Sequence, residues 1–159
     1  ENKHIGETGN VTEETPRKIY PKQEKFSAGT TLDINTADTT LLKHIPGIGS
    51  YYAQKICRYR DRLGGFVSAQ QMDEIEGLPS DIKDWITVSP HFSPERVLIN
   101  RATFKTLIHH PYLNYEQTKA IVNYRNKYGA IRSFQELSLD TNFTERDFRR
   151  LQPYIDFSK

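Results

Sequence analysis

The sequence predicts an all-α fold in which one unit of short helices occurs twice. The first observation is an internal repeat, since the sequence matches itself when it is shifted by 65 residues. The second is a series of helix-capping signals, each before a short segment with apolar residues three or four positions apart. The third is that no segment shows the strict alternation of apolar and polar residues that marks a half-buried strand.

The repeat is long and regular. Residues 34–45 read INTADTTLLKHI, and residues 99–110 read INRATFKTLIHH. At the same offset, ICRYRDRLGGFVS at 56–68 lies over IVNYRNKYGAIRS at 121–133. Because so many residue types agree at one offset, we interpret the chain as a tandem repeat whose two copies share one fold.

The 159 residues therefore divide into four parts. Residues 1–31 are polar and lack an apolar period, so we expect them to form a flexible leader or linker. The two repeat units are expected over residues 32–89 and 95–157. The linker between them, residues 90–94, begins and ends with a proline, and prolines break helices.

Capping signals place four short helices in the first unit. The first helix is expected to begin near Thr36, behind an Asn35 cap. The second is expected over residues 50–63, with Gly64 as its left-handed stop. The third and fourth are expected to follow capping signals at Ser68 and Ser80.

The second unit repeats these signals. Asn100 and Gly129 occupy the positions of Asn35 and Gly64. Most of these helices are too short to be stable alone in water, so packing between them must stabilise them. Two further helix starts are marked by the capping pairs Ser133 with Glu136 and Thr144 with Asp147.

The segment with the clearest functional signal is IPGIGSYYAQKI, residues 45–56. Two predicted helices meet there at a Gly-Ile-Gly turn, and glycines leave main-chain amides uncovered. Because the second helix begins at once, its free N–H groups and positive dipole end favour an anion such as a phosphate. A purely structural tight turn is the alternative. The predicted contact residues are Gly47, Ile48, Gly49, Ser50, Tyr51 and Lys55.

The pattern hydrophobic-Pro-Gly-Ile-Gly-x-x-x-Ala-x-x-Ile resembles the helix-hairpin-helix motif of non-sequence-specific DNA-binding proteins. The wider frame, INTAD…LLKHIPGIGSYYAQKI…YR…GGF, resembles the bacterial competence DNA receptor ComEA and its relatives. The resemblance implies two tandem, SAM-like short-helix bundles with two hairpins each, and it makes residues 76–79 the second hairpin of the first unit. Relatives of ComEA are extracytoplasmic and membrane-anchored, and the sequence leaves open whether the full-length protein is anchored in this way or is cytoplasmic.

The second unit departs from this pattern at the turn itself, where Gly47-Ile48-Gly49 is replaced by Tyr112-Leu113-Asn114. Asn tolerates the left-handed backbone conformation better than most residues, so the turn can survive. A tyrosine, however, is expected to cover the amides that a phosphate needs. The second hairpin of this unit, residues 141–144, also lacks glycine.

Charge is distributed unevenly behind a net value of only +2, which argues against binding through bulk charge. Residues 32–89 carry a net charge of −2, and residues 95–159 carry +4. Within the first unit, residues 43–62 are basic and residues 73–84 are acidic. An acidic face beside the basic turn would repel DNA and so orient any contact.

Structural roles explain several other residues. Arg60 and Arg125 are equivalent, and the copy with Arg125 has lost the glycines, so both are predicted to be structural. His44 and His109 each end the first helix of a unit, where a cation is favourable. Cys57 lies on an apolar helix face, so we expect it to be buried.

The sequence lacks the phosphate-binding-loop, zincin and nucleophile-elbow patterns. We therefore expect no enzymatic activity, metal site, cofactor or small-molecule substrate. The first functional hypothesis is weak, salt-dependent and sequence-independent binding of DNA at the Gly-Ile-Gly turn. The alternative is a protein-interaction or scaffold module that keeps an inherited fold. In that case Tyr112, Leu113 and Tyr115 would dock a protein or the other unit.

Overall fold

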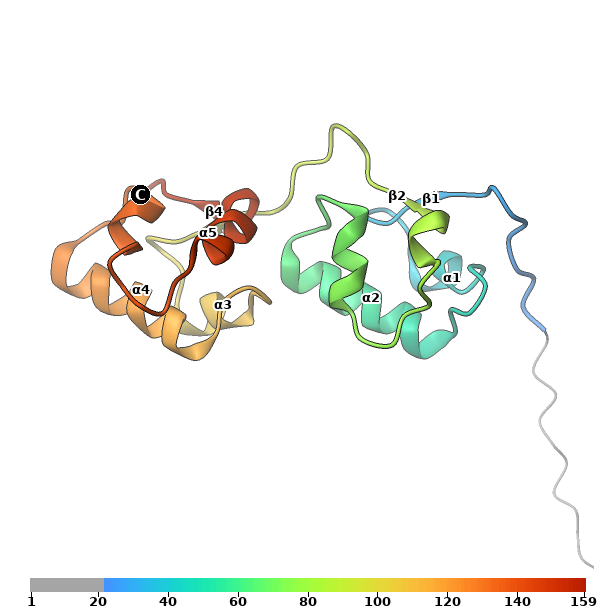
Figure 1. Ribbon diagram of the computed structural model, residues 1–159, viewed down its shortest axis with the longest axis horizontal. Coiled ribbons are helices and arrows are strands. Elements are labelled where there is room, and N and C mark those ends of the chain that lie inside the picture. Colours follow the sequence, from blue (N-terminus) through green and yellow to red (C-terminus); the bar gives the residue numbers. More distant parts are fainter. Residues whose placement is uncertain (1–21) are drawn as a thin grey trace, which may run out of the picture.

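A computed structural model describes residues 22–159 as two helical units joined by an extended linker (Figure 1). The first 21 residues of the predicted leader lie outside the described residues. The remainder of that leader contacts the first unit, since the Phe26 N–H donates to the His44 carbonyl at 2.8 Å. Within residues 22–159, no helix is both long and apolar enough to cross a membrane.

The first unit contains one long helix surrounded by shorter elements. Helix α2 spans Ser50–Leu63, as predicted, and it ends at Gly64 with a φ of 87° in the left-handed region. Helix α1 begins later than expected, because the Asp38 carboxylate, and not Asn35, accepts the N–H of Leu41. The elements are β1 (Leu32–Asp33), α1 (Thr39–Leu42), α2, the 3₁₀ helices η1 (Ala69–Glu74) and η2 (Ile82–Trp85), and β2 (Ile86–Thr87).

The second unit repeats this order and adds a regular last helix. Its long helix is α4, Tyr115–Tyr128, followed by Gly129 with a φ of 87°. The capping pair predicted at Thr144 and Asp147 is present at the start of α5. The elements are β3 (Val97–Leu98), α3 (Phe104–His109), α4, η3 (Phe134–Leu137), α5 (Glu145–Leu151), η4 (Gln152–Tyr154) and β4 (Ile155–Asp156).

Short strands correct the prediction of an all-α fold, and the fold is better described as α-rich. Strands β1 and β2 pair in parallel, with Leu32 opposite Ile86. Strands β3 and β4 do the same in the second unit, with Val97 opposite Ile155. Each strand has two residues, too few to produce the alternating pattern by which a strand is recognised in a sequence. The pairs tie the first and last elements of each unit together.

Two polar side chains repeat their roles in both units. The Asn35 side chain exchanges two hydrogen bonds with the main chain of Phe66, both at 2.8 Å. Asn100 bonds to the N–H and carbonyl of Ile131 in the same way, at 2.8 and 2.9 Å. The guanidinium of Arg60 donates to the carbonyls of Ile34 and Ala37, at 3.0 and 2.6 Å. Arg125 donates to the equivalent carbonyls in the second unit, so both arginines have the structural role predicted for them.

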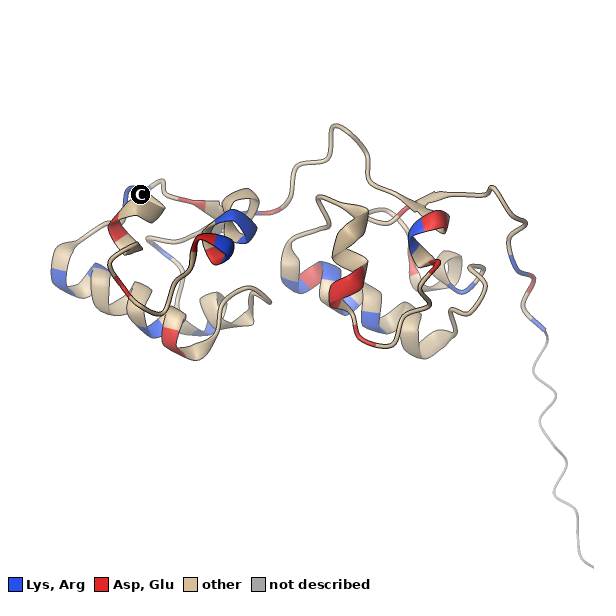
Figure 2. Cartoon of the chain, in the orientation of Figure 1, with Lys and Arg blue, Asp and Glu red and all other residues tan. Residues whose placement is uncertain are grey.

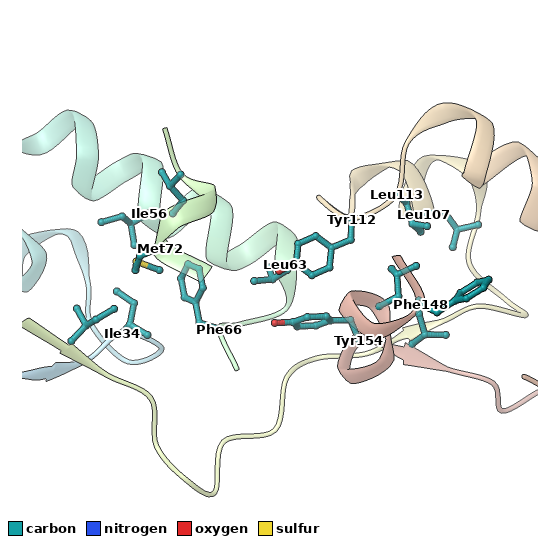
Figure 3. Packing of buried hydrophobic residues seen from close by; sticks show 14 of the residues in the cluster. Ile34, Ile56, Leu63, Phe66, Met72, Leu107, Tyr112, Leu113, Phe148 and Tyr154 are labelled. Atoms are coloured by element: carbon teal, nitrogen blue, oxygen red, sulfur yellow. The ribbon is translucent and has the colours of Figure 1, made fainter. Parts of the chain in front are cut away.

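Buried hydrophobic side chains of the two units belong to one cluster, and it crosses the junction between them (Figure 3). Leu63 and Phe66 of the first unit and Tyr154 of the second are fully buried. Tyr112 lies beside them, with 7 % of its surface exposed. The two units therefore pack against each other directly, and they are not joined by the linker alone.

Candidate nucleic-acid interface

The turn between α1 and α2 is a tight hairpin built around Gly47. Gly47 has a φ of +79°, which a side chain rarely adopts, and a Cβ there would lie 2.9 Å from Cγ of Pro79. Behind it, the Ile48 N–H donates to the Ile45 carbonyl at 3.1 Å. The Ile48 side chain is fully buried. Ile48 therefore supports the turn from the core side, and its contact with DNA stays a prediction.

Helix α2 begins at this turn without a side-chain cap. Its N-cap residue is Gly49, with an extended backbone, and no side chain accepts a hydrogen bond from its first turn. Among the α-helices of the described residues, α2 alone has this property. Its first main-chain N–H groups therefore face a ligand or solvent, and the positive end of the helix dipole lies with them. The other four α-helices are capped by Asp38, Thr103, Asn114 and Thr144.

The side chains beside this turn are open to solvent on one face of α2. Ser50 is exposed, and Tyr51 is 69 % exposed. Tyr51 makes an edge contact with Tyr52, which is partly buried against the core. The Lys55 ammonium donates to the Glu76 carbonyl at 2.7 Å and lies 5.8 Å from the centre of the Tyr51 ring. Lys55 therefore connects helix α2 to the turn that follows η1.

The charges of the first unit separate as the sequence predicts. Lysine and arginine residues lie along α2, whereas acidic residues lie on η1 and the turn that follows it (Figure 2). Asp73 is paired with Lys83 at 2.8 Å. Glu74 faces the second unit, where it contacts Arg150 at 3.2 Å. Part of the acidic segment is therefore neutralised within the protein and is not a free repulsive surface.

The equivalent helix in the second unit, α4, begins with a side-chain cap. The Asn114 side chain accepts from the Gln117 N–H at 2.9 Å, and the Gln117 side chain accepts from the Asn114 N–H at 3.1 Å. This reciprocal pair is a capping box, and it engages two of the main-chain N–H groups at the helix start, whereas no side chain engages those of α2. The repeat alignment places Asn114 at the position of Gly49. The two turns therefore differ in the feature that governs anion binding.

Tyr112, which replaces Gly47 in the repeat, points into the junction between the units. Its hydroxyl donates to the Glu74 carboxylate and accepts from the Gln71 side chain at 2.7 Å. The Arg150 guanidinium lies over its ring, 3.9 Å from the centre. Burial, with the nearby Glu74 carboxylate, raises the pKa of the Tyr112 hydroxyl. The Tyr154 hydroxyl accepts from Gln71 at 2.8 Å and donates to the Gly65 carbonyl at 3.0 Å.

The residues predicted to bind a protein, Tyr112, Leu113 and Tyr115, differ in how far they are exposed. Tyr112 and Leu113 are buried, with 7 and 5 % of their surfaces exposed. Tyr112 contacts the first unit, which was one of the two docking partners considered, and docking of a separate protein stays a prediction. Tyr115 is 58 % exposed and makes an edge contact with Phe104.

The junction also contains residues that the sequence did not single out, namely Gln71, Glu74 and Tyr154. Gln71 was recognised only as part of a capping signal, and Glu74 only as part of an acidic segment. The one signal in the sequence was the tyrosine at position 112, because a large side chain that replaces a turn glycine needs a place to pack. Within the described residues, no group of histidine, cysteine, aspartate or glutamate is arranged to hold a metal ion.

A family model described as the helix-hairpin-helix motif matches residues 27–82 and 93–156. This chain belongs to the helix-hairpin-helix family. The two matches confirm the tandem arrangement, and helix-hairpin-helix motifs generally bind nucleic acid. The resemblance to ComEA and the bacterial origin stay predictions.

Two curated relatives correct another expectation. The chain is 24 % identical to a Xenopus laevis protein named "Endonuclease/exonuclease/phosphatase family domain-containing protein 1", over 91 % of this chain and 32 % of the relative. It is 28 % identical to the Danio rerio protein of the same name, over 80 % of this chain and 28 % of the relative. The chain thus spans about a third of these relatives. No solved structure matches it.

The names of these relatives contradict our expectation of no enzymatic activity. Both are named for a domain of nucleases and phosphatases. Nothing in the residues of the chain predicted this connection, because the helix-hairpin-helix motif is itself non-enzymatic. The repeat pattern accounts for residues 32–157 without any catalytic motif.

Proposed function

We propose that the first unit binds the phosphate backbone of DNA without reading its base sequence. The binding groups are the main-chain amides of Gly47, Gly49, Ser50 and Tyr51, together with the Lys55 ammonium. The observation that carries the proposal is that α2 starts without a side-chain cap, whereas the equivalent helix α4 is capped by Asn114. An uncapped helix start favours an anion, and the phosphate group is the anion that every nucleotide presents.

Sequence independence follows from the type of contact. Amides that bond to phosphate oxygens position a protein on DNA, but they carry no information about the bases. The exposed Tyr51 ring adds a surface beside the turn. With one uncapped turn and a net charge of +2, we expect dissociation constants at or above about 10⁻⁴–10⁻⁶ M at physiological salt.

The second unit supports the first and does not bind DNA through its own turn. Two of the main-chain N–H groups at the start of α4 are engaged by the capping box of Asn114 and Gln117. Its turn residue Tyr112 is occupied with Glu74 of the first unit. The junction therefore fixes the orientation of the α2 turn relative to the second unit.

The test is a fluorescence-anisotropy titration with duplex DNA of random sequence at low salt. Gly49→Asn transfers the cap of the second unit to the first, and a Cβ at Gly49 meets nothing within 4 Å. Because the new side chain competes for the same amides, we expect about fivefold weaker binding. Lys119→Met, an exposed charge removed from α4, is the control and should bind as the parent chain does.

The absence of binding by the parent chain would exclude the proposal. So would unchanged binding after Gly49→Asn is combined with Lys55→Glu. A preference for one DNA sequence would contradict the proposed mode of contact, since main-chain amides on phosphates cannot produce it.

We further propose that, in a protein of the size of the curated relatives, this chain holds nucleic acid for a catalytic domain elsewhere in the same protein. The names of the relatives support this proposal, as does the fact that the chain spans about a third of their length. Gly49→Asn in such a protein should raise the KM for DNA and leave kcat unchanged, because only ground-state binding is weakened. A fall in kcat with an unchanged KM would contradict it.

A further inference from the structure

Lys25, in the segment before β1, is an exposed residue whose ammonium group lies against the turn between α1 and α2. Its Nζ donates to three main-chain carbonyls, those of Lys43, Ile45 at 3.2 Å and Ile48 at 2.9 Å. These carbonyls come from the end of α1 and from the turn itself. An ammonium has three N–H donors and no acceptor, so the three oxygens satisfy it completely.

The residues on either side of Lys25 are anchored to the same turn. The Phe26 N–H donates to the His44 carbonyl at 2.8 Å, and the two rings lie 5.2 Å apart. Nδ1 of His44 donates to the Glu24 carbonyl at 2.6 Å. Three consecutive residues therefore contact the end of α1 and the turn. Lys25 is held there by its own main chain as well as by its ammonium.

The peptide between Ile48 and Gly49 connects this contact to the proposed DNA site. No peptide bond among the described residues is cis, so the Ile48 carbonyl and the Gly49 N–H point in opposite directions from one planar unit. Because the carbonyl faces the Lys25 ammonium, the Gly49 N–H faces away from it. That N–H belongs to the N-cap residue of the uncapped helix. The Lys25 ammonium thus fixes the direction of the Gly49 N–H, although it does not contact that group.

The partial charges of the three carbonyls also connect the Lys25 ammonium with the proposed DNA site. Three carbonyl oxygens that converge on one place concentrate partial negative charge there. Without a cation between them they would repel one another and also a phosphate that approaches the turn. The ammonium removes this repulsion and adds a positive charge close to the amides.

We propose that Lys25 is a positioning residue of the DNA site, whose ammonium closes the ring of three carbonyls and so directs the turn amides toward phosphate. This inference rests on the proposed function, and it adds to the site a residue that lies outside both repeat units. The family matches begin at residue 27, so the residue is not part of the motif that they describe.

The first experiment needs no DNA. The full chain is treated briefly with acetic anhydride, and the acetylation rate of each lysine is followed by mass spectrometry. Lys25 and Lys22 are both exposed, so a difference in their rates would not come from burial. An ammonium bound by three carbonyls must leave them before it reacts, so Lys25 should react several-fold more slowly than Lys22. Equal rates at the two lysines would overturn the proposal, whatever the chain does with DNA.

The second experiment measures affinity for random duplex DNA with three variants. Lys25→Met should weaken binding about tenfold, because charge-assisted hydrogen bonds of the turn are lost. Lys22→Met removes the same charge from the same segment and should change affinity by about twofold or less. Lys25→Arg keeps the charge, but its planar fork does not match three converging carbonyls, so it should also weaken binding.

The salt dependence separates positioning from direct contact. If Lys25 acts through the turn, Lys25→Met lowers the affinity without changing the slope of log K against log salt, because no phosphate contact is lost. A slope reduced by about 0.9 would show a direct contact and overturn the positioning role. Wild-type affinity in Lys25→Met or in Lys25→Arg would also overturn it while the proposed function stands. No binding by the parent chain would instead remove the proposed function.

Discussion

The hydroxyl of Tyr112 lies 3.0 and 2.8 Å from the two carboxylate oxygens of Glu74, across the junction between the units. Tyr112 occupies the repeat position of Gly47. The substitution that removed a turn glycine from the second unit thus supplied a central side chain of the junction. One turn kept its glycines and its free amides, and the other became a packing surface for the first unit.

Removal of that hydroxyl should destabilise the protein. Tyr112→Phe leaves the ring in place but deprives Glu74 of a donor and Gln71 of an acceptor. Because hydrogen bonds to charged groups contribute about 1.5–3 kcal/mol, we expect a loss of that size in the free energy of unfolding. The measurement is a urea titration followed by circular dichroism.

The matched control is Tyr115→Phe, since Tyr115 is 58 % exposed and no hydrogen bond of its hydroxyl is found among the described residues. We expect a change within about 0.5 kcal/mol. Equal unfolding energies for the two variants would mean that the junction does not contribute to stability.

The sequence predicted the parts of the fold that local chemistry determines. The bounds of α2, the stop at Gly64 and the capping box at Thr144 follow from residue types that satisfy main-chain groups nearby. The two-residue strands were missed because they have no pattern of their own. The start of α1 was misplaced because Asn35 and Asp38 are both cap residues. Only the structure shows that Asn35 bonds to Phe66, 31 residues away.

Less of the candidate site than of the fold could be predicted from the sequence. The glycines at 47 and 49 look alike in the sequence, but one is needed for its φ and the other leaves a helix start uncapped. Lys25 could not be connected with the turn, because the segment before the repeat has no counterpart within the chain. The junction was hidden for a similar reason, since contacts between units leave no periodic signal.

The two glycines should respond differently to substitution. Gly47→Ala forces a side chain into the left-handed region and against Pro79, so we expect a loss of about 2–4 kcal/mol. Gly49→Asn should instead raise the free energy of unfolding by about a few tenths of a kcal/mol, because asparagine is a better N-cap than glycine by that amount. Thermal unfolding of both variants is the measurement. A destabilised Gly49→Asn would indicate that its effect on DNA binding comes from misfolding.

Buried His110 should make the stability depend on pH. Its side chain is 2 % exposed, its Nδ1 accepts from the Tyr112 N–H at 3.2 Å, and its Nε2 has no partner among the described residues. Burial lowers the pKa of His110 to about 4, although the main chain of Leu63 acts to raise it. The positive charges of Arg62, Arg150 and His109 act in the same direction as burial. The folded protein therefore keeps this imidazole neutral where the unfolded chain already binds a proton.

Because the unfolded state takes up the proton first, stability is complete above about pH 6.5 and is lost as the pH falls toward 4. From this group alone we expect a loss of about 3 kcal/mol across that window. Urea titrations at several pH values measure it, and His110→Phe should flatten the profile between pH 4 and 6.5. His91→Gln, in the exposed linker, is the control. An unchanged profile in His110→Phe would assign the pH dependence to other groups.

Lys55 is the side chain for which we expect direct phosphate contact, and the salt dependence of binding tests it. Its ammonium uses one donor on the Glu76 carbonyl at 2.7 Å, and its two other N–H groups remain for a phosphate oxygen. Lys55→Met should therefore reduce the slope of log K against log salt by about 0.9, the amount expected for one phosphate contact. Lys119→Met should leave the slope unchanged, because α4 is not expected to touch DNA. If both variants reduce the slope equally, the ammonium of Lys55 acts only as part of the general charge of the protein, and the main-chain amides alone form the site.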